Sequence, residues 1–398
     1  SAAAITVTDA VSKANADTLN GFTGGKVTLQ SVEDEYANIQ LIKDINTAEV
    51  DMDAAAIKVT DSVDKTKVDD LRTDTTGNIT LTSITEDKAD LATIAGFTDV
   101  ILSTANITVT DNVDKSEADT IDAYSNTSGT VTLTSITDTV SNVTAVENNT
   151  NISLDTSTIT VTDAATLANA NAINNFTTAQ VTLNEVKDTV ANIESINGLT
   201  TSEVSIAAAA ITVTDAVNLD NATAINGFTT GQVTLQNVQD SYANIQFIDA
   251  ITESELTMSS SDITVTDQVN FVKINTLANQ TSLSNVITVN DVADTKMLLA
   301  ITKGNSRVLL NKADITVSDD VSKAEADTIN AYNNAGGTVT LTSITDNFTN
   351  VKDTQATVGI AMAAAVVTVT DAVTKAQADA LNLLTNGQVT LESVEDTN

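Results

Sequence analysis

The chain repeats itself, and this periodicity constrains its fold more than any other feature of the sequence. The motif ITVTD, or a near copy, begins at residues 5, 57, 107, 159, 211, 263, 315 and 367, and a motif of the type VTLxS follows each copy. Regular self-similarity of this kind indicates repeats that stack on one another. We therefore predict that residues 1–398 form a single solenoid of seven full repeats and a partial eighth, numbered here from these starts.

The fifth repeat, residues 211–262, illustrates the expected elements. Strands alternate apolar and polar β-branched residues, whereas helices place apolar residues three or four apart. These patterns predict a strand at 211–215, a helix within 218–228, a strand at 233–236, a helix within 240–251 and a short strand at 256–258. The repeat is therefore a β-α-β-α-β unit.

Helices this short are unstable alone, so stacking must bury their apolar faces. The expected fold class is α/β: a right-handed repeat solenoid with parallel strands and short helices, either leucine-rich-repeat-like or an α/β-helix. The two main strands of each repeat could alternate in one sheet or form separate sheets. Because helices pack further apart than strands do, the one-sheet version should be curved.

The composition removes many kinds of chemistry. The chain has no proline, cysteine, histidine or tryptophan, and its 53 acidic against 18 basic residues give a net charge of −35. Cysteine and histidine nucleophiles, bases and metal ligands are thus excluded, and we expect no enzyme. Phosphate backbones would be repelled, so we expect no nucleic-acid partner. The sequence contains no apolar run long enough to span a membrane.

Carboxylates recur at two positions of the repeat. The first motif closes on an aspartate in every copy: Asp9, Asp61, Asp111, Asp163, Asp215, Asp267, Asp319 and Asp371. Seven residues after the start of the second motif lie Asp34, Asp138, Asp188, Asp240, Asp294, Asp346 and Asp396, with Glu86 in the remaining copy. Stacked repeats would align these side chains in two columns, in which like charges lie a few ångströms apart and repel one another. They are candidate helix caps, because aspartate accepts hydrogen bonds from free backbone N–H groups. Alternatively the columns bind Ca²⁺, a cation that prefers oxygen ligands; no other cofactor is expected.

Two further features have functional interpretations. Threonines recur at the second position of both motifs and should face outward, where they favour strand formation or, in an ice-binding protein, would order water. The sixth repeat carries Lys296, Lys303, Arg307 and Lys312 in an otherwise acidic chain. It could contact an acidic neighbour.

The order of the motifs resembles the β-strand-repeat segments of giant bacterial exoproteins, in which ANI-containing helices alternate with ITLTD strands. The matching pieces include Ala37-Asn38-Ile39, Ala191-Asn192-Ile193, Ala243-Asn244-Ile245 and every ITVTD copy. This resemblance implies a secreted or cell-surface location. The calcium-binding nonapeptides that often accompany such segments are absent from the sequence.

We therefore expect an extracellular structural protein that self-assembles into a bacterial surface layer, sheath or filament and attaches to cell-surface glycan. A chain that stops within its eighth repeat should expose unpaired strands for end-to-end assembly. The alternatives are an adhesin or spacer solenoid and, from another class, an ice-binding protein.

Overall fold

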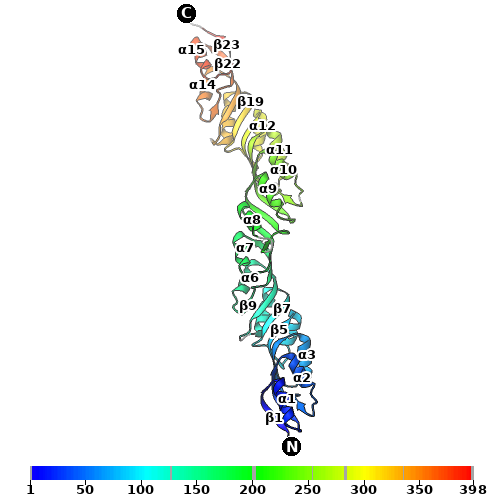
Figure 1. Cartoon of the computed structure of the whole chain (residues 1–398). Coiled ribbons are helices and arrows are strands. Elements are labelled where there is room, and N and C mark those ends of the chain that lie inside the picture. Colours follow the sequence, from blue (N-terminus) through cyan, green and yellow to red (C-terminus); the bar gives the residue numbers. More distant parts are fainter. Residues whose placement is uncertain are drawn as a thin grey trace. The chain divides into compact units, whose positions relative to one another are not determined.

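The computed structural model of the chain confirms the predicted α/β repeat solenoid of parallel strands and short helices (Figure 1). The structure describes residues 2–125, 128–199, 203–252, 254–281, 285–334 and 336–395. Contacts group the chain into two units, Ser1–Val186 with Ser195–Ile206 and Lys187–Glu194 with Ala207–Asn398. The same β-α-β-α-β repeat builds both units.

Each full repeat contains two long strands and one short strand. The first strands carry the ITVTD motif: β1 (Ile5–Val11), β4 (Ala56–Val63), β7 (Asn106–Val113), β10 (Thr158–Ala165), β13 (Ala210–Val217), β16 (Asp262–Val269), β19 (Asp314–Val321) and β22 (Val366–Val373). The second strands carry the VTLxS motif: β2 (Val27–Asp34), β5 (Ile79–Glu86), β8 (Val131–Asp138), β11 (Val181–Asp188), β14 (Val233–Asp240), β17 (Ile287–Asp294), β20 (Val339–Asp346) and β23 (Val389–Val394). The short strands are β3 (Val50–Asp51), β6 (Val100–Ile101), β9 (Ile152–Ser153), β12 (Val204–Ser205), β15 (Leu256–Thr257), β18 (Val308–Leu309) and β21 (Ile360–Ala361).

Every long strand except the last one, β23, is followed by a helix. The first helices of the repeats are α1 (Lys13–Phe22), α3 (Lys65–Asp74), α5 (Lys115–Asp122), α7 (Leu167–Asn174), α9 (Leu219–Asn226), α11 (Phe271–Gln280), α13 (Lys323–Asn330) and α15 (Lys375–Asn382). The second helices are α2 (Tyr36–Lys43), α4 (Lys88–Ala95), α6 (Val140–Glu147), α8 (Val190–Asn197), α10 (Tyr242–Asp249), α12 (Lys296–Gly304) and α14 (Phe348–Ala356). None of the described helices has the length and hydropathy needed to cross a membrane.

Within each unit the first and second strands alternate in one parallel sheet, which settles the choice between the two predicted geometries. Ile5 of β1 pairs with Val27 at the start of β2, whereas Val32, near the end of β2, pairs with Ile57 at the start of β4. The short strand β3 pairs with the start of β2 on the same edge that β4 occupies further along. Each repeat is therefore shifted along the strand direction relative to the one before it.

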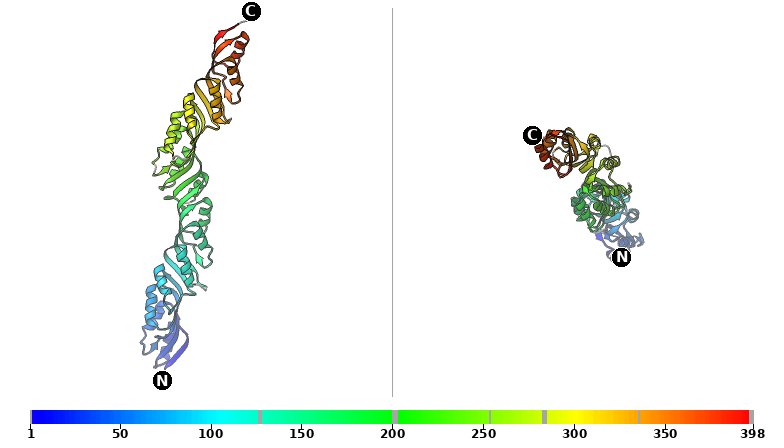
Figure 2. Two further views of the ribbon diagram at one scale, coloured as in Figure 1. Left: turned by 180° about the vertical axis from the view of Figure 1, so that it is seen from behind. Right: turned by 90° about the horizontal axis from the view of Figure 1, so that it is seen from above.

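This shift explains how every long strand can be followed by a helix without curling the sheet. The expectation that a one-sheet solenoid must curve is therefore wrong: within each unit the sheet is open (Figure 2). The ladder advances five residues between Val27 and Val32, or about 16 Å along the strands, while two strands add about 10 Å across the sheet. The resulting diagonal of about 19 Å accommodates two helices packed about 8–10 Å apart. The sheet can therefore stay open.

The core lies between the sheet and the helices. In the first repeat Leu29 and Val32 of β2 are buried against Ile39 and Ile42 of α2, and the polar residues between them in the sequence face away. The same alternation recurs in both units, so short helices gain stability from apolar burial that a lone repeat could not provide.

Candidate functional site: carboxylates at the helix N-termini

The aspartates that close the first motif lie in a β-bulge. In β4 two residues, Thr60 and Asp61, stand between the paired positions Val59 and Ser62, where β5 contributes only one. A bulge re-aims a side chain, and Asp61 Oδ1 accepts a 2.7 Å hydrogen bond from the N–H of Tyr36, the first residue of α2 in the preceding repeat. Equivalent bonds of 2.6 to 2.9 Å are made by Asp61, Asp111, Asp163, Asp215, Asp267, Asp319 and Asp371, which we call the bulge aspartates.

The carboxylates of the second motif stand at the end of each second strand and contact two helices. Asp240 Oδ2 accepts from the N–H of Leu219, the first residue of α9, at 2.9 Å. Its other oxygen accepts from the N–H of Ser241 at 2.7 Å and from the Asn244 side chain at 2.9 Å. The hydrogen bond from the first N–H of the first helix recurs at Asp34, Glu86, Asp138, Asp240, Asp294 and Asp346. Asp188 accepts from the N–H of Thr189, just before the second helix. We call these seven residues the strand-end carboxylates.

These bonds confirm the predicted capping role, with one correction. Asp240 is not itself the N-cap of α10; the N-cap is Ser241, whose hydroxyl accepts from the N–H of Asn244 at 3.3 Å, and Asp240 binds the N–H of that cap. Asp9 occupies the bulge of β1 and is exposed. Asp396 lies outside the described residues.

The expectation that identical carboxylates stack a few ångströms apart is wrong. One long strand lies between the strands of successive bulge aspartates, so two strand spacings place them at least about 10 Å apart. The shift between repeats increases this distance further. Repulsion between stacked like charges therefore provides no reason for a cation, and calcium binding by these residues stays a prediction.

Asparagines in the first turn of the second helices contribute to these caps, a role that was not predicted from the sequence. Asn38 donates from its side-chain nitrogen to Asp34 Oδ1 at 2.8 Å, and the same bond recurs at Asn142, Asn192, Asn244 and Asn350. Three of these are the central residues of the ANI segments. In the sequence, the feature that could have indicated this bond is the constant spacing of four residues, about one helical turn, between the carboxylate and the asparagine.

Hydrogen bonding lowers the pKa of four of the strand-end carboxylates. Burial alone would raise the pKa of Asp34, but the N–H groups of Lys13 and Glu35 and the Asn38 amide outweigh it and lower the pKa below its usual value. The same opposing effects, with the lowering ones larger in sum, act on Asp138, Asp240 and Asp346. The ionised form of each of these groups is thus stabilised by folding.

The second repeat departs from this pattern. It has Glu86 at the strand end and Asp90 where five other repeats have the asparagine, and the carboxylate oxygens of Glu86, Asp87 and Asp90 lie within 4.8 Å of one another. No other group of three carboxylates in the described ranges meets this criterion. Two of these carboxylates already accept backbone bonds, Glu86 from Lys65 at 2.8 Å and Asp87 from Asp90 at 2.8 Å.

A chelator experiment separates capping from calcium binding. Because the bulge and strand-end carboxylates already accept N–H bonds, we expect the melting midpoint to be the same with excess Ca²⁺ and with EDTA. A cation bound only by the folded state at 100 times its Kd would add about 2.7 kcal/mol of stability. A calcium-dependent midpoint that is lost in D90N, which restores the common pattern, would contradict this expectation and locate the cation.

The threonines of both motifs face away from the core, as predicted. Thr6 pairs with Thr28, and Thr264 with Thr288, with both members of each pair at least partly accessible to solvent. The second repeat interrupts the series with Lys58, which forms an ion pair with Glu33 at 2.8 Å. Register and exposure thus account for these residues as strand formers.

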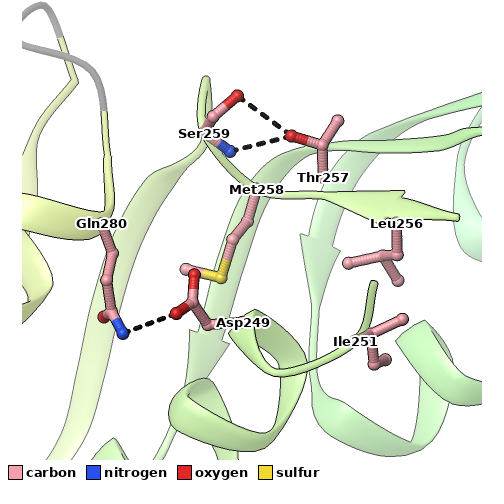
Figure 3. Close-up of a pocket in the computed structure, with 7 residues that line it drawn as sticks. All are labelled: Asp249, Ile251, Leu256, Thr257, Met258, Ser259 and Gln280. Atoms are coloured by element: carbon pink, nitrogen blue, oxygen red, sulfur yellow. Dashed lines mark hydrogen bonds between the residues drawn. The ribbon is translucent and has the colours of Figure 1, made fainter. Parts of the chain in front are cut away.

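The cavity drawn in Figure 3 lies where the fifth and sixth repeats meet. Its volume is about 280 Å³, and its lining includes Asp249 on α10 and Gln280 on α11, which share a 2.7 Å hydrogen bond. The equivalent positions in the first two repeats are Lys43 and Asp74, and there they form an ion pair. A hydrogen bond between Asp249 and Gln280 thus joins the fifth and sixth repeats where an ion pair joins the first and second.

Comparisons with protein-family models, with curated proteins and with solved structures find no match. The first N–H groups of the helices point to the carboxyl ends of the parallel strands, the edge where α/β proteins bind anions. Here the chain's own carboxylates accept these hydrogen bonds.

Proposed function

We propose that this chain is a non-catalytic, extracellular structural protein of a bacterial surface that self-assembles into a layer, sheath or filament. The observation that carries the proposal is the contact between successive repeats. The C-terminal half of β2 pairs with the N-terminal half of β4, with Val32 opposite Ile57. The same register pairs β5 with β7 and β14 with β16. Two different surfaces meet in this contact, and repetition of such a contact generates open-ended assemblies.

Two further observations support a structural role. The helix N-termini that could bind an anionic substrate are taken up by carboxylates of the same chain. The resemblance of the repeats to segments of bacterial exoproteins supports the surface location. We propose glycan attachment at the cell surface on the same ground, and no nucleic-acid partner because of the net charge of −35.

Electron microscopy of the purified chain tests the proposal. We expect fibres or a periodic lattice, and more of them at an ionic strength of about 0.15 M or above, where repulsion between acidic copies is screened beyond about 8 Å. Isolated particles at every salt concentration and protein concentration would contradict self-assembly. They would favour the second candidate, an adhesin or spacer, whose repeats need no contact with other copies.

A further inference from the structure

The sixth repeat differs from the others in charge. Residues 263–314 contain five basic and four acidic side chains, which gives a net charge of +1, whereas each of the other repeats carries between −4 and −7. Part of this positive charge is used within the chain, because Lys296 pairs with Glu325 at 2.9 Å and Arg307 donates to the Ala278 carbonyl at 2.7 Å. Lys303, in the last turn of α12, has no ion-pair partner among the residues that the structure describes.

The helices of the sixth repeat also expose apolar side chains. Val272 on α11 is 66% exposed, and Met297 and Ile301 on α12 are 65% and 49% exposed. Met297 and Ile301 are four residues apart and so share one helix face, and α12 packs directly on α11. The equivalent residues four repeats earlier are Thr66, Ala89 and Thr93. We call Val272, Met297, Ile301 and Lys303 the repeat-6 patch.

The neighbouring fifth repeat offers a surface of the complementary kind. A groove of about 790 Å³ between α9 and α10 is lined by the apolar residues Phe247 and Ile251 and by the carboxylates of Asp220 and Glu255. Phe247 is 62% exposed. The whole fifth repeat has no basic residue and a net charge of −7. We call these four lining residues the repeat-5 groove; α9 to α12 are labelled in Figure 1.

We propose that the repeat-6 patch of one copy docks in the repeat-5 groove of a second copy, and that the reverse contact forms at the same time. Such an isologous pair needs both surfaces on one chain, and here they lie on adjacent repeats. Apolar side chains would be removed from water at its centre, and Lys303 would meet Asp220 or Glu255 at its rim. This proposal rests on the proposed self-assembly and supplies its lateral contact, separate from the strand edges.

The test compares two doubly substituted chains of equal charge. M297E/I301E places two carboxylates in the patch, and the matched control A89E/T93E places them at the equivalent exposed positions of α4. Sedimentation velocity should detect a dimer in the unsubstituted chain and in the control, with at least tenfold weaker association of M297E/I301E. Circular dichroism checks that both variants are folded. Equal association of all three chains would overturn the proposed contact.

Cross-linking identifies the partner surface. A carbodiimide joins amines to carboxylates that are in contact, and a mixture of ¹⁵N-labelled and unlabelled chains distinguishes links between copies from links within one. We expect mixed-label links from Lys303 to Asp220 or Glu255. Mixed-label links only to other acidic residues, or no dimer at all, would overturn the patch. If M297E/I301E forms fibres normally and no chain forms a dimer, only the lateral contact is rejected. If neither fibres nor dimers form in any chain, the proposed function is contradicted as well.

Discussion

Lowering the pH below about 4 should destabilise this protein, because folding stabilises the ionised form of four of the strand-end carboxylates. The pKa values of Asp34, Asp138, Asp240 and Asp346 lie below their ordinary value of 3.8 in the folded chain. A depressed pKa contributes stability that is fully present above the unfolded value. That contribution falls as the pH drops below 3.8 and is gone once the folded pKa has been passed.

A single substitution isolates this effect from the general loss of negative charge. D240N removes a carboxylate that accepts from Leu219, Ser241 and Asn244. At pH 7 we expect a loss of about 1–2 kcal/mol in the free energy of unfolding, the usual size for a charged group at a helix N-terminus. Below pH 3.8 the unsubstituted chain loses the same contribution, so the difference between the two proteins should shrink.

Urea unfolding at a series of pH values between 7 and 2.5 measures this difference. The matched control is D155N, which removes the same charge from an exposed turn residue. If D240N and D155N had equal effects at pH 7, the hydrogen bonds to Asp240 would contribute nothing to stability. A difference that stayed constant down to pH 2.5 would show that this carboxylate titrates alike in the folded and unfolded chain.

The sequence predicted the elements of the fold because each repeat confirms the pattern of the others. Alternation at Ile211 and Val213 and helical spacing at Ile245 and Ile248 placed strands and helices within a few residues of those in the structure. The parallel direction followed from the stacking of equivalent strands. The pairing register could not be predicted from the pattern within a single strand, because it depends on which residues of β2 pair with β4.

A comparison of the two motifs contained the information for the bulge. Val7 and Val11 of the first motif are four residues apart, whereas Leu29 and Val32 of the second are three apart, and all four take part in one ladder. Two paired strands with unequal spacings must accommodate one extra residue. The capping role of Asp61 was predicted for its residue type, but its partner, the N–H of Tyr36 in the preceding repeat, follows only from this bulge and the shift between repeats.

Removal of one whole repeat should leave a folded protein. After deletion of residues 107–158, β5 would meet β10 in the register that it now has with β7, because Ile159 replaces Ile107 opposite Ile84. The N–H of Lys88 on α4, which now donates to Asp111 at 2.9 Å, would find Asp163 in the same place. Stability in stacked repeats is approximately a sum of repeat and interface contributions, so we expect a melting midpoint within about 5 °C of the original.

Removal of half a repeat should be far more damaging. Deletion of residues 107–130 takes out β7 and α5 and brings β8 directly after the second repeat. A second strand has no bulge aspartate, so the N–H of Lys88 would lose its acceptor, and apolar residues of α4 such as Leu91 and Ile94 would lose the helix packed beside them.

Circular dichroism and limited proteolysis distinguish the two deletions. The whole-repeat deletion should keep its ellipticity per residue and its resistance to protease. The half-repeat deletion should be cleaved near the junction and should melt earlier or aggregate. If both deletions unfolded the chain equally, the repeats would not be interchangeable units, and the common register on which the proposed self-assembly rests would lose its significance. If both stayed equally stable, the bulge aspartates would not be needed to join one repeat to the next.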